Sequence, residues 1–457
     1  MRSDAVTQDG LPPAERWRAM GTIAIAVTMA VLDGAIANIA LPTIAHDMAA
    51  SPASSIWVVN AYQLAVTVSL LPLSSLGDIV GHRRVYTIGL ALFTLASGAC
   101  ALTHSLPALV AARIVQGFGG AGIMSVNTAL IRFIFPRAHL GRGLGFNALI
   151  VATSAALGPT IAAAILAVAD WHWLFAINVP LGVVALTLAL RVLPGTPSSG
   201  HRFDLTSAVL NAVTFGLLIT AVDGLGDPGH GMLVAAEAAG GIAIGFLFVR
   251  RQLALAAPML PVDLFRRPIF ALSVATSVCS YTAQGLAFVS LPFFFQNVGG
   301  LSPIETGLLM TPWPAIVVIV APISGRLSDR YPAGILGGLG LAAMTAGLVS
   351  LLLLPAHAGY ANVAWRMALC GLGFGFFQSP NNRLLVGSAP RERSGAGSGM
   401  LATARLVGQT TGSALVALAF GLTATAGGLA AGSKLAMGMA VAASAAGMVA
   451  STLRLRT

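Results

Sequence analysis

Charged side chains are scarce in this sequence. Asp, Glu, Lys and Arg make up 9% of its 457 residues, whereas a soluble globular protein carries roughly 25%. This composition excludes an ordinary soluble enzyme. It excludes a disordered chain as well, because 56% of the residues are hydrophobic and disordered chains are polar. We therefore expect an integral membrane protein.

Cysteine and clustered histidine are also lacking. The cysteines Cys100, Cys279 and Cys370 lie far apart within apolar runs and form no metal-binding spacing. The histidines are scattered among the predicted loops, without a Ser-His-Asp or metal arrangement. There is no Walker loop, which excludes ATP-driven pumping. We predict no metal and no cofactor.

Apolar runs long enough to cross a bilayer recur along the whole chain. A spanning helix needs about 20 mostly apolar residues. Fourteen runs meet this requirement, and they predict an all-α membrane protein with fourteen transmembrane helices. These runs lie near residues 18–41, 54–76, 85–103, 107–131, 144–168, 173–193, 205–223, 231–249, 269–295, 304–325, 334–354, 361–386, 397–424 and 434–453.

The basic residues are distributed unevenly among the predicted loops. With both termini inside, the cytoplasmic segments hold nearly all of the 25 basic residues, and the outer loops hold only Lys434. This asymmetry follows the positive-inside rule and predicts a multi-pass protein of the cytoplasmic (inner) membrane with both termini cytoplasmic. It explains the net charge of +10 by topology and contact with anionic membrane lipids, so no nucleic-acid partner is predicted.

The first and last thirds of the chain repeat each other. The repeat predicts two six-helix bundles of the same orientation, 18–193 and 269–453, joined by a linker, 194–268, with two inserted transmembrane helices. Residues 1–17 and 454–457 are the predicted cytoplasmic tails. Five features recur in order at a spacing of about 250 residues: Leu41-Pro42 as Leu291-Pro292, Pro72 as Pro322, Asp78 as Asp329, Arg113 as Arg366, and Gly158 as Gly412.

Five short motifs follow one another through the first bundle. They are LDGAIANIALP at 32–42, LGDIVGHRR at 76–84, RIVQG at 113–117, Gly158-Pro159, and WHWLFAINVPLG at 171–182. In order, these resemble motifs of the major facilitator superfamily, and specifically of its fourteen-span drug:proton antiporter branch. The resemblance covers essentially the whole chain. It implies the major facilitator fold, with two six-helix bundles that rock about a midplane site.

Two acidic residues lie within predicted spans, and both are candidates for proton coupling. A carboxylate deep in a bilayer costs about 2.5–3.5 kcal/mol on insertion scales, and burial favours its neutral form. We therefore predict that Asp33 binds and releases the coupling proton. The alternative is a carboxylate that only holds helices together. Glu237 is a second candidate, although a position near the membrane interface is the simpler explanation for it.

The substrate cavity is predicted from spans one, two, four and five and their second-half equivalents. Apolar and aromatic walls with few polar groups suit an amphipathic organic molecule. The resemblance implies that Arg113 is a partner of the acid on span one or of substrate. Arg405 has no counterpart in the first half and is expected to shape an anionic or polar patch. The predicted cavity residues are Asn38, Trp57, Tyr62, Gln63, Arg113, Gln116, Asn147, Tyr281, Gln284, Phe288, Phe293, Trp313, Phe377, Gln378, Asn381 and Arg405.

A further group of residues is predicted to control the conformational change. Asp78 is expected to pair with Arg83 and Arg84 across the cytoplasmic mouth. Gly158-Pro159 removes one helical hydrogen bond and permits close helix approach, which predicts a bend between the two halves. The full set is Asp78, Gly81, Arg83, Arg84, Gly158, Pro159, Gly325, Asp329 and Arg330.

The function predicted from these observations is a monomeric, proton-coupled antiporter that exports lipophilic drug-like molecules by alternating access and thereby confers antibiotic resistance. One alternative is a dedicated exporter of a single endogenous metabolite or lipid, because broad and narrow exporters share these motifs. Another is a membrane-embedded acyl or glycosyl transferase, which requires a cluster of His, Asp or Glu facing one side of the bilayer. The sequence shows no such cluster.

Overall fold

A computed structural model describes residues 10–136, 139–196, 203–224, 231–255, 260, 262–328, 330–355, 358–388, 394–423 and 428–456. No strand occurs in these residues, which confirms the all-α class. Thirteen of the described helical segments are long and apolar enough to cross a membrane. A fourteenth, α15 (Tyr360–Gly387), has 28 residues and a less apolar sequence because it carries Arg366 and Arg383.

The first bundle contains six spans, two of which are broken near one end. Ser51 caps the short helix α2 by accepting a hydrogen bond from the backbone N–H of Ser54 at 3.1 Å, so the second span begins as a separate turn. The spans are α1 (Pro13–Asp47), α2 (Pro52–Ser55) with α3 (Trp57–Val80), α4 (His82–Ala101), α5 (Leu106–Ile134), α6 (Leu140–Leu166), and α7 (His172–Ala176) with α8 (Asn178–Val192).

The second bundle repeats this arrangement. Its second span begins with a capping box, in which Ser302 and Glu305 exchange side-chain and backbone hydrogen bonds. The elements are η3 (Val262–Arg266), α11 (Pro268–Phe293) with the π-helical η4 (Phe294–Val298), α12 (Pro303–Met310) with α13 (Pro312–Leu327), α14 (Ala333–Leu352), α15, α16 (Ser394–Thr423), α17 (Gly428–Leu453) and η6 (Arg454–Arg456).

Equivalent helix pairs in the two bundles pack closely through glycine. A Cβ atom on Gly89 of α4 would lie 2.8 Å from the Cα of Gly122 on α5. A Cβ atom on Gly340 of α14 would lie 2.7 Å from the carbonyl oxygen of Gly373 on α15. Small residues let helix backbones approach one another within a membrane, and here they do so at the same place in both repeats.

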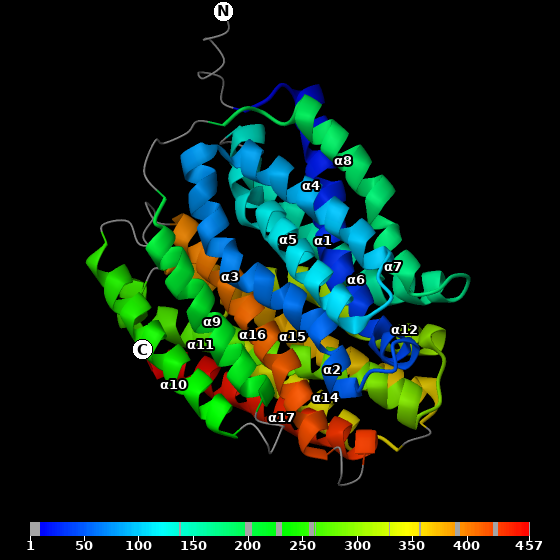
Figure 1. The fold of residues 1–457 in the computed structure, drawn as a ribbon. Coiled ribbons are helices and arrows are strands. Elements are labelled where there is room, and N and C mark those ends of the chain that lie inside the picture. Colours follow the sequence, from blue (N-terminus) through cyan, green and yellow to red (C-terminus); the bar gives the residue numbers. More distant parts are fainter. Residues whose placement is uncertain are drawn as a thin grey trace, which may run out of the picture.

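The inserted helices α9 (Leu205–Gly224) and α10 (Gly231–Ala254) pack against each other at the edge of the molecule (Figure 1). Arg251 of α10 and Asp204, which precedes α9, form an ion pair at 2.9 Å. Helix α9 contacts α3 and α16, one helix from each bundle. The predicted fold of two six-helix bundles plus two inserted helices is therefore confirmed.

The two bundles contact each other mainly through α1, α3 and α6 on one side and α11, α12, α13 and α16 on the other. Gln296 donates to the carbonyl of Ile39 at 3.0 Å, and the hydroxyls of Thr160 and Thr311 lie 2.9 Å apart. A Cβ atom on Gly307 of α12 would lie 2.5 Å from the carbonyl oxygen of Pro159. These contacts lie toward the ends of the helices that are predicted to face outward.

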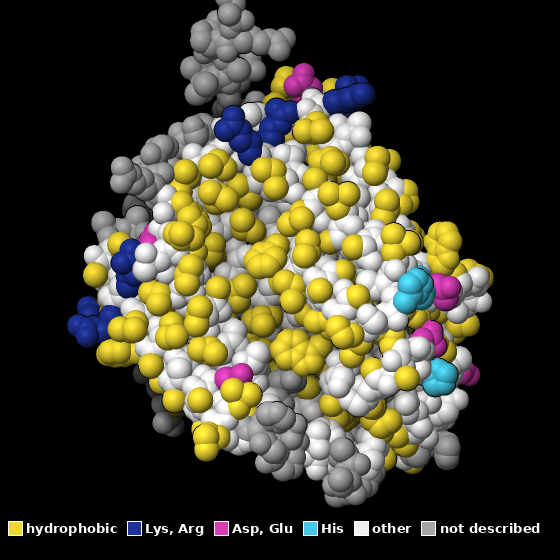
Figure 2. Space-filling model, in the orientation of Figure 1, with side chains coloured by type: hydrophobic (Ala, Val, Ile, Leu, Met, Phe, Trp, Pro, Cys, Tyr) yellow, Lys and Arg dark blue, Asp and Glu magenta, His cyan; other side chains and the backbone are white. Residues whose placement is uncertain are grey.

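Charge is concentrated at the margins of the molecule. In Figure 2, Lys and Arg lie along the upper and left edges, near the start of α1 and the end of α10, and His lies along the right edge, while acidic side chains lie at the right edge and also at the top, left and lower left. Hydrophobic side chains cover much of the surface between them. A broad apolar surface between charged margins matches the demands of a bilayer.

Candidate functional site

A buried charge pair lies at the centre of the first bundle. Asp33 on α1 is 3% exposed and Arg113 on α5 is fully buried. The guanidinium Nη1 of Arg113 donates to Oδ2 of Asp33. Gln116, one turn further along α5, donates to Oδ1 of Asp33 at 2.8 Å. Asn178, at the start of α8, donates to the same oxygen at 3.2 Å. The Asp33 carboxylate thus has donors on two other helices.

Arg113 is held by a second set of contacts. Its Nε donates to the carbonyl of Val58 at 2.9 Å, and its Nη1 donates to Oε1 of Gln116 at 2.6 Å. The guanidinium carbon lies 4.3 Å from the ring centre of Tyr62 and 5.4 Å from that of Phe175. A buried ion pair repays its desolvation only with such additional partners. The Asp33–Arg113 pair thus belongs to one hydrogen-bonded cluster that joins α1, α3, α5 and α8.

Sequence motifs singled out Asp33, Arg113 and Gln116, but not Asn178 as a partner of Asp33. Asn178 belongs to the WHWLFAINVPLG motif and is 5% exposed. A polar amide within an apolar span was the available signal. Ser97 was also missed; its hydroxyl accepts a hydrogen bond from Nε2 of Gln116 at 2.9 Å.

Arg405 lies on α16, a helix of the second bundle that contacts α3 of the first bundle. It projects from α16 and is partly exposed. On the same helix, Gly408 packs against Tyr281 of α11, and the hydroxyl of Thr410 lies 3.4 Å from that of Thr67 on α3. Gln378 of α15 donates to the Tyr281 hydroxyl at 3.0 Å. Arg405, Tyr281 and Gln378, three of the predicted cavity residues, therefore lie on helices that pack together, α16, α11 and α15.

The remaining predicted cavity residues fall into two groups. Asn38, Phe293, Trp313, Phe377 and Asn381 are buried. Most pack within the second bundle, where Phe293 stacks edge-on against Phe420 and Trp313 against Phe288, and Asn381 bonds to Ser277 at 2.7 Å and Arg454 at 2.6 Å. The partly exposed group is Trp57, Gln63, Asn147, Gln284 and Phe288. Contact of either group with substrate stays a prediction.

Glu237 lies apart from the Asp33 cluster. It is partly exposed on α10, in the inserted pair, which packs at the edge of the fold. The structure does not bring Glu237 together with Asp33 or Arg113. A role in proton coupling for this residue stays a prediction.

The predicted pairing of Asp78 with arginines is wrong in this structure. Asp78 is exposed, and its carboxylate lies 3.4 Å from Nε2 of His82, one helical turn away. Arg83 instead uses Nη2 to donate to the carbonyl of Leu190, and Arg84 is exposed. Gly81 ends α3 between Asp78 and the two arginines, and His82 is the first residue of α4.

This turn depends on Gly81, which has a φ of 99°. Side chains rarely adopt that conformation. A Cβ atom there would also lie 3.1 Å from the backbone oxygen of Thr196, and the Thr196 hydroxyl accepts from the Arg83 backbone N–H at 3.3 Å. The segment after α8 is thereby held against the loop.

The other predicted gating residues are placed as follows. Gly158 of α6 packs against Ala35 of α1, and the neighbouring Pro159 contacts Gly307 of the second bundle, so this motif lies where the halves meet. In the second loop, Gly325 faces Ser379 of α15 and Arg330 is exposed. Asp329 lies outside the described residues.

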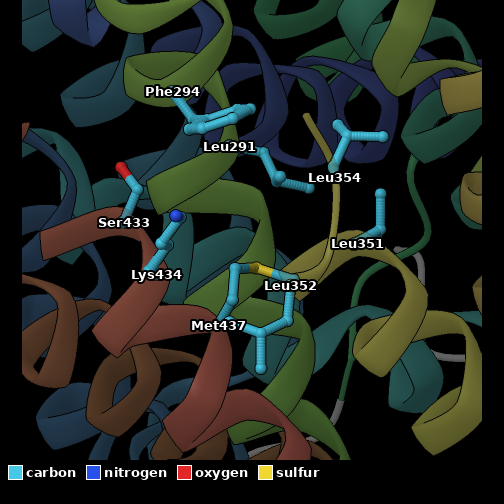
Figure 3. A pocket seen from close by; sticks show the side chains of 8 residues that line it. All are labelled: Leu291, Phe294, Leu351, Leu352, Leu354, Ser433, Lys434 and Met437. Atoms are coloured by element: carbon cyan, nitrogen blue, oxygen red, sulfur yellow. The ribbon is translucent and has the colours of Figure 1, made fainter. Parts of the chain in front are cut away.

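A small surface pocket occurs in the second bundle, with a volume of about 10 Å³, roughly the space of one water molecule. Figure 3 shows its lining side chains, which come from α11, η4, α14, the segment that directly follows α14, and α17. None of the predicted cavity residues lines it. Its walls are mainly apolar, with Lys434 beside Ser433 as the polar part: Leu291, Phe294, Leu351, Leu352, Leu354, Ser433, Lys434 and Met437. Within the described residues, no group of His, Cys, Asp and Glu is arranged to hold a metal.

Known proteins with similar sequences are transporters. The chain is 60% identical over 415 residues to the "Uncharacterized transporter YebQ" of Escherichia coli (strain K12), covering 90% of this chain and 91% of the relative. It is 32% identical to the riboflavin transporter RibZ of Clostridioides difficile (strain 630), covering 90% of each. It is 34% identical to the multidrug resistance protein Stp of Mycobacterium tuberculosis (strain CDC 1551 / Oshkosh), covering 87% of this chain and 75% of Stp.

Similar folds are found among solved transporters. A bacterial homologue of the human lysosomal transporter Spinster, in an inward-facing and unoccupied conformation, superimposes with a TM-score of 0.69. The match covers 98% of this chain and 99% of that one, at 15% identity. The family description "Major Facilitator Superfamily" matches residues 23–413. Together with the two-bundle fold, these similarities show that the chain belongs to the major facilitator superfamily of membrane transporters.

Proposed function

We propose that this chain is a proton-coupled antiporter of the fourteen-span branch that exports amphipathic, drug-like molecules. The observation that carries the proposal is the Asp33 carboxylate, which is buried within membrane-spanning helices and surrounded by hydrogen-bond donors. A buried acid of this kind is a functional-site candidate, because it is expensive to keep inside a membrane.

The cluster around Asp33 gives proton binding a structural consequence. The ionised carboxylate accepts from Arg113, Gln116 and Asn178. Once protonated, it no longer compensates the buried charge of Arg113, so α1, α5 and α8 must adjust their packing. The ionised and the protonated forms of Asp33 therefore favour different packings of these helices, which is the property of a two-state switch.

Alternating access requires the contact between the bundles to open on one side at a time. The contacts of Thr160 with Thr311 and of Gln296 with Ile39 lie toward the predicted outer ends of their helices. They support a state closed toward the outside, with both termini cytoplasmic. We further propose that the protein works as a monomer in the cytoplasmic membrane, surrounded by lipids.

Relatives named for multidrug resistance support a broad substrate range. A relative named as a riboflavin transporter, at similar identity, supports the second candidate, a dedicated exporter of one endogenous metabolite. The two candidates differ in the number of compounds that one purified protein moves. The test is a screen of cationic, neutral and anionic dyes in inside-out vesicles, in which several structurally unrelated substrates indicate broad export and a single substrate indicates dedicated export.

A further inference from the structure

Arg405 places a positive charge between the two bundles. The charge of Arg113 is balanced by Asp33, and that of Arg251 by Asp204. In the part of the chain that the structure describes, no carboxylate forms an ion pair with Arg405, and its Nε is buried without a hydrogen-bond partner. A charge in the membrane interior is costly unless something pairs with it.

A second donor faces the same region. The Tyr281 hydroxyl accepts a hydrogen bond from Gln378 at 3.0 Å, and its own hydrogen has no acceptor among the described residues. Gly408, one turn beyond Arg405 on α16, packs against Tyr281 of α11, because a Cβ atom on Gly408 would lie 2.7 Å from the Tyr281 Cβ. The site therefore combines a guanidinium on α16 with the phenol group of Tyr281 on the adjacent helix α11.

We propose that Arg405, together with the Tyr281 hydroxyl, binds an anionic group of the transported molecule, such as a carboxylate or sulfonate. This inference rests on the proposed transport function and specifies its substrate class. A guanidinium offers several N–H donors in a plane that matches such groups. The aromatic rings beside it suit the apolar part of an amphipathic anion, whereas a cationic group meets a like charge.

The charged groups of the anion site and of the proton site lie in different bundles. Asp33 and Arg113 form a pair with no net charge inside the first bundle, while Arg405 belongs to the second. A variant of Arg405 is therefore expected to change ligand selection without removing the Asp33–Arg113 pair. Binding measured without a proton gradient isolates this property from coupling, so failure of one proposal does not imply failure of the other.

The experiment compares two probes that share an aromatic skeleton. The anion 1-anilinonaphthalene-8-sulfonate and its uncharged parent N-phenyl-1-naphthylamine are titrated onto the full chain in phosphatidylcholine nanodiscs. Arg405→Gln is expected to weaken sulfonate binding about tenfold or more, the range of one charge-assisted hydrogen bond, and to leave the neutral probe within about threefold. Arg405→Lys should retain most of the anion preference.

The matched control is Arg366→Gln. Arg366 also lies within a span, but it donates to the carbonyl of Ser350 at 2.7 Å, away from the bundle junction. Its replacement should change neither affinity. Equal loss of both probes in Arg405→Gln, or no preference for the anion in the wild type, overturns the proposal. Loss of the preference when phosphatidylglycerol is added also overturns the proposal, because it indicates that Arg405 binds the anionic headgroup of a lipid and not the transported molecule.

Discussion

At the level of single residues, the Asp33 cluster shows what a sequence can predict. An acid within an apolar run is visible directly, and the RIVQG motif points to Arg113 and Gln116. The contribution of Asn178 to Asp33 was not predictable from either motif alone, because the two residues are 145 positions apart. Only the packing of α1 against α8 brings them within hydrogen-bond distance.

The charge pair makes a testable prediction about stability. Arg113→Gln leaves the Asp33 carboxylate buried without its cation, which costs about 3–5 kcal/mol while the carboxylate stays ionised. Protonation removes that unpaired charge, so the purified variant should melt at a higher temperature at acidic pH than at alkaline pH, relative to the wild type. The double variant Asp33→Asn/Arg113→Gln should lack this dependence. An equal loss of stability at all pH values contradicts the assignment.

Asp78 makes a prediction about rate. Its contact with His82 is solvent-exposed on the Asp78 side, and exposed pairs contribute about 0–1 kcal/mol, so Asp78→Asn should leave thermal stability nearly unchanged. If the loop carboxylate acts in only one of the two conformations, the variant should slow turnover while ligand affinity stays within a few-fold. His82→Gln serves as the control for the observed pair. A collapse of binding in a folded Asp78→Asn protein removes Asp78 from the gate.

At the level of helices, hydropathy predicts the spans but not their ends or breaks. The predicted first span, 18–41, is shorter than α1, because its polar first turns and Pro42 do not end the helix. The second, sixth and tenth spans are each divided into two helices, at positions where hydropathy alone gives no signal. In the tenth span, Pro312 stands at the first position of α13, whereas neither a capping side chain nor a proline at the first helical position marks the start of α3 or α8.

Contacts between helices of opposite bundles should be breakable during transport. With the native cysteines removed, Thr160→Cys/Thr311→Cys joins α6 to the start of α13, where the native hydroxyls are 2.9 Å apart. Oxidation of this pair should stop transport, and reduction should restore it. The control is Thr345→Cys/Ser444→Cys, from a 2.8 Å contact within the second bundle, which should tolerate cross-linking. Transport that continues after complete cross-linking of the first pair contradicts alternating access at this contact.

At the level of the whole molecule, the internal repeat was the strongest sequence signal. It predicts two bundles with six helices each. The matching glycine contacts, of α4 with α5 and of α14 with α15, agree with this prediction. The relative placement of the bundles was not predictable, because it depends on side chains such as Thr160 and Gln296 that have no distinctive pattern in the sequence.

Membrane orientation follows from the distribution of arginine and is open to direct measurement. In a cysteine-free background, Val168→Cys, which is 87% exposed in the native protein, should react with an impermeant thiol reagent in intact cells. Arg266→Cys, exposed in the segment before α11, should react only after the cells are opened. Labelling of position 266 from outside contradicts the fourteen-span topology with cytoplasmic termini.

Proton coupling through Asp33 is the central claim, and it is tested most directly by substrate-induced proton movement in proteoliposomes. The wild type should move protons against the direction of substrate, and Asp33→Asn should bind substrate but move no protons. Glu237→Gln, altered on the peripheral helix α10, should behave like the wild type. Undiminished proton movement in Asp33→Asn contradicts the account, and its loss in Glu237→Gln alone assigns the coupling to the inserted pair.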